Sequence, residues 1–191
     1  MKVIILNGPP RSGKDIAATF IKKDMRNVGM FTFKRPLVAV LRAIVPVDNS
    51  HHHTMLNTDL KDVESQWCGG LTPRQLMIKI SEEWIKPVFG NDHLGKLAAY
   101  QIQTTPCEFA VFPDGGFDDE VEVLAKTFGY DNIYVIHIHR PGCSYDDDSR
   151  SYINLQGIYY GEIVNRFDLE LYRTQIRRLL TEWKMPITPP E

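Results

Sequence analysis

Short runs of adjacent apolar residues alternate along this chain with segments in which apolar residues recur every three or four positions. A strand that is buried on both faces gives a continuous apolar run, as strands of a parallel sheet do. Such runs predict strands over residues 3–6, 30–33, 109–112 and 133–138, with a weaker strand over 158–164. Because strands alternate with helical segments, the pattern predicts an α/β fold built on a doubly wound parallel sheet with helices on both faces.

The helical segments carry recognisable start signals. Pro36 opens one helix at its first position, where the missing N–H has no intrahelical partner to lose. Thr72 is placed to cap another helix, and Gln75 completes a capping box with it. The buried stripe of that second helix is expected to contain Leu76, Met77, Ile80 and Trp84. Further helices are expected over residues 15–25, 93–103, 121–128 and 169–183.

Residues 46–70 are polar and irregular, and they predict an inserted or mobile loop. The segment contains His51, His52 and His53, which together invite a metal-site interpretation. Three adjacent histidines cannot all face one ion on a regular element, however. A solvated loop is therefore the favoured interpretation of the three histidines.

The composition fits one globular domain without a membrane span. The chain has 191 residues, of which 43% are hydrophobic and 24% charged, so it can bury a sizeable core. Its net charge of -2 provides no overall basic field for nucleic acid. No apolar run approaches the roughly 18 residues that a membrane span needs. Three cysteines without metal-ligand spacing fit a reducing compartment, so a cytoplasmic location is expected.

The stretch GPPRSGKD, residues 8–15, lies between the first predicted strand and the first predicted helix. It fits the phosphate-binding signature G-x-x-x-x-G-K-[ST] except at its last position. In this context backbone N–H groups and the helix dipole point at a phosphate, and the lysine reaches the β- and γ-phosphates. The alternative is a chance glycine-rich turn. The residues expected to bind ATP are Gly8, Pro9, Pro10, Arg11, Ser12, Gly13, Lys14 and Asp15.

Two aspartates are candidate ligands of Mg²⁺. Asp15 stands where the signature has a hydroxyl residue, and a carboxylate is a harder oxygen ligand for this ion. Asp114 follows a predicted strand, at the edge where open α/β sheets bind their ligands. Each has a structural alternative: Asp15 complements the helix dipole, and Asp114 is a turn residue before two glycines.

The loop sequence R-S-G-K-D, residues 11–15, resembles the phage deoxynucleoside monophosphate kinases, which are relatives of thymidylate kinase. Further stretches agree with this family in chain order, namely 33–37, 71–77, Asp114 with Glu120, and 138–142. The resemblance implies a P-loop NTPase fold of the nucleoside monophosphate kinase type. It implies a single kinase domain over residues 1–191, with a helical acceptor-binding insertion over 36–105 and a lid-like loop over 140–157.

The resemblance also implies an activity and roles for individual residues. ATP and Mg²⁺ would be the cofactors, and a deoxynucleoside monophosphate would be the acceptor. Phosphoryl transfer needs cations around the γ-phosphate, which makes Lys14, Arg140 and Arg150 the candidate catalytic residues. Arg140 and Arg150 could instead form plain surface ion pairs. The candidates for binding the acceptor are Arg35, Arg74 and Asp114.

Two departures from the family keep other functions open. Gly116 stands where the family has an arginine, and the lid-like loop contains acidic residues at 146–148. An alternative is therefore a kinase that phosphorylates 5-hydroxymethyluracil in phage DNA, although the chain lacks the basic stripe that DNA binding needs. A regulatory ATP-binding protein is a further alternative. A homodimer is possible, and a phage-encoded protein would act in the host cytoplasm.

Overall fold

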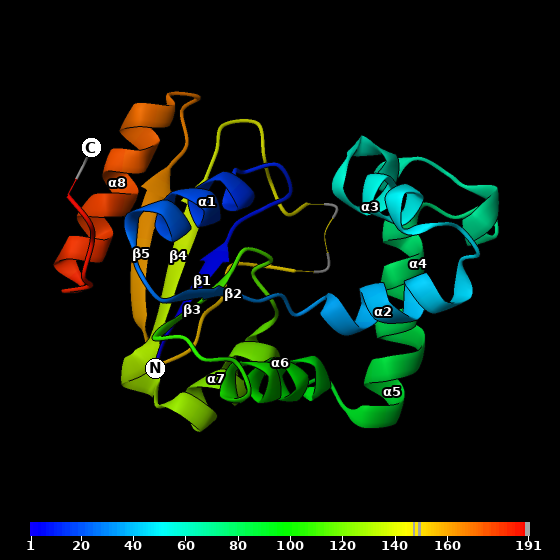
Figure 1. The fold of residues 1–191 in the computed structure, drawn as a ribbon, viewed down its shortest axis with the longest axis horizontal. Coiled ribbons are helices and arrows are strands. Elements are labelled where there is room, and N and C mark those ends of the chain that lie inside the picture. Colours follow the sequence, from blue (N-terminus) through cyan, green and yellow to red (C-terminus); the bar gives the residue numbers. More distant parts are fainter. Residues whose placement is uncertain (147, 149, 190–191) are drawn as a thin grey trace. The chain divides into compact units, whose positions relative to one another are not determined.

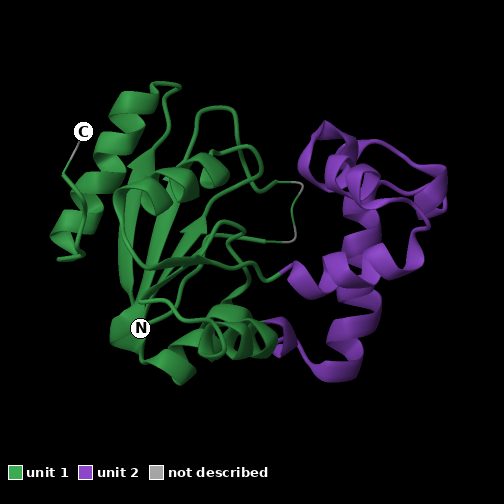
Figure 2. Cartoon of the chain, in the orientation of Figure 1, with its two compact units in different colours: residues 1–33, 95–191 green, residues 34–94 purple. Residues whose placement is uncertain are grey.

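The computed structural model describes residues 1–146, 148 and 150–189. The chain forms two compact units (Figure 2). Unit 1 consists of residues 1–33 and 95–191, and unit 2 consists of residues 34–94. In the part of the chain that the structure describes, no helix has both the length and the apolar character that a membrane crossing requires.

Unit 1 is built on a five-stranded parallel sheet with the order β2-β3-β1-β4-β5 (Figure 1). Its strands are β1 (Lys2–Asn7), β2 (Val28–Met30), β3 (Phe109–Phe112), β4 (Ile133–His139) and β5 (Tyr159–Val164). The first strand of the chain is central, since β1 pairs with both β3 and β4. The predicted parallel α/β sheet is confirmed.

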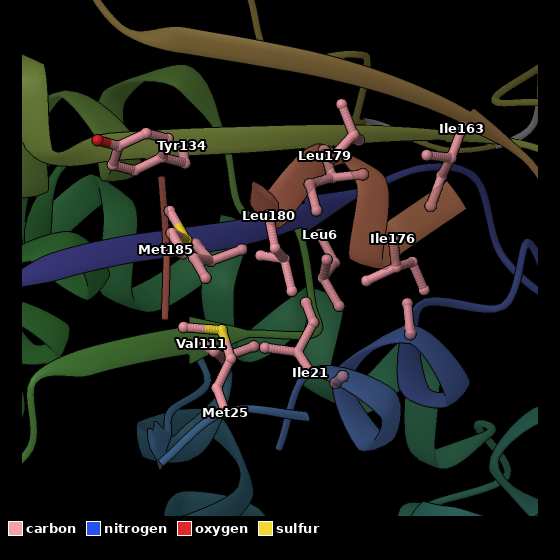
Figure 3. Packing of buried hydrophobic residues seen from close by; sticks show 14 of the residues in the cluster. Leu6, Ile21, Met25, Val111, Tyr134, Ile163, Ile176, Leu179, Leu180 and Met185 are labelled. Atoms are coloured by element: carbon pink, nitrogen blue, oxygen red, sulfur yellow. The ribbon is translucent and has the colours of Figure 1, made fainter. Parts of the chain in front are cut away.

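Helices cover both faces of this sheet. One face carries α1 (Lys14–Asp24) and α8 (Leu169–Glu182), and the other carries α6 (His93–Gln103) and α7 (Asp118–Phe128). A short 3₁₀ helix, η4 (Tyr130–Asn132), precedes β4. Alternate side chains of β1 enter opposite cores, because strand side chains point to opposite faces in turn. Ile4 and Leu6 join the core under α1 and α8 (Figure 3), and Val3 and Ile5 join the core under α6 and α7.

The second strand lies earlier in the chain than the sequence predicted. β2 covers Val28–Met30 rather than residues 30–33, and it pairs with β3 from Val28 opposite Phe109. Phe31 and Phe33 are buried after the strand has ended, and both rings stack on Phe112, with centroids 5.8 and 4.6 Å away. The N–H of Phe31 still donates to the carbonyl of Val111 at 2.9 Å, but beyond that bond the apolar character of this segment reflects core packing. Periodicity alone cannot distinguish core packing from strand pairing.

Unit 2 is helical and has its own core. Its elements are α2 (Arg35–Ile44), α3 (Asn49–Asn57), η1 (Asp59–Asp62), η2 (Gln66–Cys68), α4 (Pro73–Lys79), the π-helical η3 (Ile80–Ile85) and α5 (Lys86–Phe89). The capping box predicted for α4 is confirmed, with Thr72 and Gln75 each bonding the other's backbone N–H. Buried residues such as Leu41, Met55 and Ile80 form the core of this unit.

The prediction that the three histidines lie in a loop is wrong. His51, His52 and His53 lie on α3, which begins after Asp48, whose side chain accepts a hydrogen bond from the backbone N–H of His51 at 2.7 Å. This cap supplies the start signal that the polar composition obscured. His52 is buried with 3% exposure, while its two neighbours are exposed, so successive histidines face different directions. The conclusion that they form no common ion site is unchanged.

The buried stripe predicted beyond Thr72 is only partly correct. Ile80 is buried, but Trp84 is 51% exposed. Between them the chain is π-helical over Ile80–Ile85. A π-turn holds more residues than an α-turn, so a side chain beyond it rotates away from the stripe that a 3.6-residue period predicts.

A buried carboxylate ties α1 to α8 and to the C-terminal segment. Asp24 is 1% exposed, and it pairs with Arg173 and with Arg177, whose Nη1 lies 2.9 Å from its Oδ1. The backbone carbonyl of Asp24 also accepts a hydrogen bond from the N–H of Thr188 at 2.8 Å. Burial opposes the charge on Asp24, but the hydrogen bonds and charges of the two arginines outweigh it and lower the pKa of this carboxyl below its ordinary 3.8.

Removing this carboxylate should destabilise unit 1. We expect Asp24→Ala to lower the free energy of unfolding by about 3 kcal/mol, since it leaves two arginines without their partner. Arg178→Ala is the control, because Arg178 forms an exposed pair with Glu182 and should cost less than about 1 kcal/mol. Urea unfolding at neutral pH measures both changes.

The pH dependence of the same measurement has a definite sign. Because the folded pKa of Asp24 lies below the unfolded one, its contribution is present above about pH 4 and is lost as the pH falls through the folded pKa. The difference in stability between the wild type and Asp24→Ala should therefore shrink below pH 4. A difference that stays constant down to pH 2.5 would contradict the assigned ion pairs.

Candidate phosphate-binding site

The glycine-rich loop joins the end of β1 at Asn7 to the start of α1 at Lys14, as the signature requires. Gly8 lies against β4: a Cβ atom there would be 2.6 Å from the carbonyl oxygen of Ile138. Gly13 has a φ of 107°, in the left-handed region where a side chain is strained. Both glycines of the motif are therefore required by the backbone itself. The loop opens at the carboxyl edge of the sheet, where α/β folds bind ligands.

Lys14 is folded back onto the loop. Its Nζ donates hydrogen bonds to the carbonyls of Gly8 at 2.6 Å and Pro9 at 2.7 Å. Burial, and next the nearby charge of Arg150, lower its pKa to about 8. An anion that enters the loop would counteract the lowering of this pKa, because it supplies the negative charge that the buried ammonium lacks.

Three carboxylates lie within electrostatic reach of this ammonium, those of Asp15, Asp114 and Asp148. Asp15 is exposed in the first turn of α1, and Asp114 follows β3. The hydroxyl of Thr32, just after β2, donates a hydrogen bond to Asp114 Oδ2 and fixes the direction of that carboxylate. The structure thus brings Lys14 together with both predicted magnesium ligands.

These oxygen donors fit Mg²⁺ as it is usually held beside phosphates. Among the described residues, no three His, Cys, Asp or Glu side chains form a metal cage. Magnesium does not require one, because it commonly binds one or two carboxylates together with water and substrate phosphates. Asp15 and Asp114 are suitable for that arrangement, and their role as ligands stays a prediction.

Arg150 reaches the same site from the lid-like loop. Its Nη2 lies 2.6 Å from Asp148 Oδ2, its Nε donates to Oδ1 at 2.9 Å, and its Nη1 donates to the carbonyl of Asp114 at 3.4 Å. Hydrogen bonding by Asp148 raises the pKa of Arg150. One acidic residue of the loop therefore orients a cation instead of repelling phosphates. Asp147, another of the predicted acidic residues, lies outside the described residues.

Three described residues of the lid-like loop are held by Asn7, a residue that the sequence analysis missed. Asn7, with 1% exposure, donates to the hydroxyl of Tyr145 at 3.2 Å and to the carbonyl of Ser151 at 3.3 Å. Its Oδ1 accepts a hydrogen bond from the N–H of Ile153 at 3.0 Å. Asn7 is a polar residue at the end of a strand whose residues 3–6 are apolar, and this position was the sequence signal that could have identified it. Tyr145, Ser151 and Ile153 are thus anchored to the last residue of β1, directly before the glycine loop.

Arg140 and Arg11 are placed differently from Arg150. Arg11 is exposed, and its carbonyl accepts a hydrogen bond from Arg140 Nη1 at 2.8 Å. The guanidinium of Arg140 also lies over the ring of Phe167, 4.3 Å from the ring centre. Arg140 therefore contacts the backbone of the loop, and its predicted catalytic role stays a prediction.

The two arginines proposed for the acceptor belong to unit 2. Arg35 is exposed at the first position of α2. Arg74 lies in the first turn of α4, where its Nε is 2.5 Å from Asp62 Oδ1. Their predicted role as an acceptor clamp stays a prediction, and Arg74 would have to exchange Asp62 for a phosphate.

Gly116 cannot simply be replaced by the arginine of the family. Its φ is 69°, and a Cβ atom would lie 2.7 Å from the ring of Phe33 and 3.0 Å from Glu120 Oε2. Phe33 cannot yield easily, because it stacks on Phe112 in the core. Beside Gly116 is a cavity of about 190 Å³, lined by Gly116, Phe117, Asp118, Asp119 and Ser151. Its lining contains the carboxylates of Asp118 and Asp119 and, among the described residues, no cationic side chain.

Comparison with solved structures shows similarity in fold across nearly the whole chain. A putative kinase from Chloroflexus aurantiacus matches with a TM-score of 0.50 and 11% identity, over 95% of this chain and 96% of that one. Shikimate kinase from Acinetobacter baumannii matches with a TM-score of 0.47 and 11% identity, over 97% and 96%. Thymidylate kinase from Candida albicans matches with a TM-score of 0.44 and 8% identity, over 100% and 96%. No protein-family model matches the sequence, and no curated protein matches it either.

The parallel sheet with helices on both faces, the glycine loop between β1 and α1, and the similarity in fold to the Chloroflexus aurantiacus structure confirm the predicted fold class.

The crowding at Gly116 can be tested by stability. We expect Gly116→Ala to lower the free energy of unfolding by about 3 kcal/mol, from the strained φ and the clash with Phe33 together. Gly142→Ala is the matched control, since Gly142 has a φ of 79° but no atom within 4 Å of a new Cβ. It should cost about 1 kcal/mol. Equal losses in urea unfolding would show that Phe33 does not restrict this position.

Proposed function

We propose that this protein is a kinase that uses ATP and Mg²⁺ to phosphorylate a deoxynucleoside monophosphate. The observation that carries the proposal is the cluster at the mouth of the glycine loop, where Lys14, Asp114 and Arg150 lie close together. Phosphoryl transfer depends chiefly on positioning and on stabilising charge, and this cluster offers both.

Each residue has a definite task in this proposal. Lys14 would exchange the carbonyls of Gly8 and Pro9 for the β- and γ-phosphates of ATP. Arg150, oriented by Asp148, would stabilise the charge on the transferred group. Asp15 and Asp114 would hold Mg²⁺, which when bound neutralises charge between the β- and γ-phosphates.

The reaction balances without a general base. An anionic oxygen of the acceptor's phosphate forms a bond to the γ-phosphorus, and the bond from that phosphorus to the bridging oxygen breaks. The products are ADP and a deoxynucleoside diphosphate. Arg35 and Arg74 would bind the acceptor's phosphate, since guanidinium groups pair bidentately with it. A cytoplasmic location and a homodimer are parts of this proposal that remain to be measured.

A second candidate function is the phosphorylation of 5-hydroxymethyluracil in DNA. It is favoured by the surroundings of Gly116, where no arginine fits and the cavity wall carries Asp118 and Asp119. An acidic cavity suits a hydroxyl group better than a phosphate. The formal net charge of -2 argues against a long DNA-binding surface, so this function ranks second. A purely regulatory ATP-binding protein ranks third.

The metal assignment predicts a rescue. Asp15→Asn should raise the Mg²⁺ concentration needed for half-maximal rate, because an amide is a poorer ligand than a carboxylate. Asp15→Ser should recover most of the activity, because a serine hydroxyl is the ligand that the signature usually provides. Lys14→Ala serves as the inactive reference and should lose several orders of magnitude in kcat. If Asp15→Ser and Asp15→Ala are equally impaired across the Mg²⁺ titration, Asp15 is not a metal ligand.

The acceptor is decided by transfer of label from ATP to a panel of deoxynucleoside monophosphates and to DNA containing 5-hydroxymethyluracil. With a mononucleotide, the rate should fall only gently between 50 and 200 mM salt, because one phosphate is bound. Arg35→Ala and Arg74→Ala should then raise the KM for that acceptor and leave the KM for ATP nearly unchanged. Labelling of DNA alone, with a steep dependence on salt, would replace the first function by the second. No labelling of any acceptor, with slow release of phosphate, would favour the regulatory protein.

A further inference from the structure

Three consecutive carbonyl groups of the glycine loop are each bound by a side chain from a different part of unit 1. Arg140 Nη1 donates to the carbonyl of Arg11 at 2.8 Å, as described above. Asn165 Nδ2 donates to the carbonyl of Ser12 at 3.0 Å. The hydroxyl of Tyr172 donates to the carbonyl of Gly13 at 3.3 Å, and the same carbonyl accepts the first hydrogen bond of α1 from the N–H of Ala17 at 3.0 Å.

Two of the three donors are deeply buried. Asn165, directly after β5, is 3% exposed, and Tyr172 in α8 is fully buried. Asn165 is itself fixed, because its N–H donates to the carbonyl of His139 at 2.8 Å and its Oδ1 accepts from the N–H of Phe167 at 3.1 Å. A buried amide with both ends engaged is a rigid donor and not a solvated surface group.

The orientation of a carbonyl determines the orientation of the next N–H. A trans peptide is planar, and its C=O and N–H point in opposite directions. Holding the carbonyls of Ser12 and Gly13 from behind therefore aims the N–H groups of Gly13 and Lys14 to the opposite side. These N–H groups lie at the N-terminus of α1, where backbone donors and the helix dipole attract an anion.

The close approach of Asn165 also explains the second glycine of the motif. A Cβ atom on Gly13 would lie 2.5 Å from Asn165 Nδ2 and 3.5 Å from the hydroxyl of Tyr172. Gly13 is thus required by the side chains behind the loop in addition to its φ of 107°.

We infer that Asn165 and Tyr172 are positioning residues that hold the phosphate-binding loop in its anion-binding conformation from behind. The inference rests on the proposed function in that it assigns the loop to a polyphosphate. Neither side chain contacts the ligand in this arrangement. Both act through the backbone, by avoiding the cost of reorienting two peptide groups when the polyphosphate binds.

Binding to the full-length protein tests this inference without turnover. Calorimetry would measure the affinity for ATP and for inorganic tripolyphosphate, each with Mg²⁺. We expect Asn165→Ala to weaken both ligands by the same factor, roughly tenfold, and Tyr172→Phe to weaken both roughly threefold, as the loss of one hydrogen bond implies. Tyr172→Phe keeps the ring in the core, so it remains informative if Asn165→Ala folds poorly.

Gln175→Ala is the matched control. Gln175 is also an amide that bonds the end of β5, donating to the carbonyl of Val164 at 3.0 Å and accepting from its N–H at 3.0 Å. Among the described residues, its side chain bonds only Val164 and the carbonyl of Leu171, so its removal should perturb β5 without changing either affinity.

The outcomes separate the inference from the proposed function. Wild-type affinity in both Asn165→Ala and Tyr172→Phe would overturn the inference, as would an equal loss in Gln175→Ala. A loss for ATP without a loss for tripolyphosphate would also overturn it, because Asn165 would then act through the base. If tripolyphosphate binding follows the expected pattern but no acceptor is ever phosphorylated, the inference stands and the proposed kinase function fails.

Discussion

The close packing of Gly8 against the carbonyl of Ile138 is the constraint on which the site depends. β1 is the central strand, and its last residue, Asn7, pairs with His137 of β4. Only a residue without a side chain lets the chain leave β1 while still touching β4, since a Cβ atom would lie 2.6 Å from that carbonyl. The loop is consequently fixed relative to the sheet before any ligand arrives. The positions of Lys14 and of the start of α1 follow from this contact.

Two cations, Lys14 and Arg150, and several carboxylates lie around the glycine loop. The pKa of Lys14 is lowered to about 8 by burial and by Arg150, and the surrounding carboxylates only partly offset this. Arg150 is compensated by Asp148, with which it shares several hydrogen bonds. Lys14 thus has less negative charge around it than a buried ammonium needs, and an anion in the loop would supply that charge.

The two units contribute different kinds of residue. Unit 1 provides the loop, the carboxylates and Arg150, and buried hydrogen bonds such as those of Asn7 and Asn165 fix their geometry. Unit 2 provides Arg35 and Arg74 on helices with well-formed starts, and their side chains are more accessible to solvent.

The sequence by itself determined the alternation of strands and helices in unit 1, the glycine loop after the first strand and the cap of α4, because these depend on neighbours within a few residues. A continuous apolar run, two glycines with a lysine, and Thr72 with Gln75 are local signals. Only the tertiary structure decided that β2 ends before Phe31 and that Gly116 excludes an arginine, because both follow from packing between distant segments. The structure also showed that Trp84 turns outward, in the π-helical segment Ile80–Ile85. Contact between distant segments likewise decided the place of Asn165, which is 153 residues from the carbonyl it holds. A hydrogen bond over that separation leaves no periodic trace in the chain, so no pattern along the sequence could reveal it.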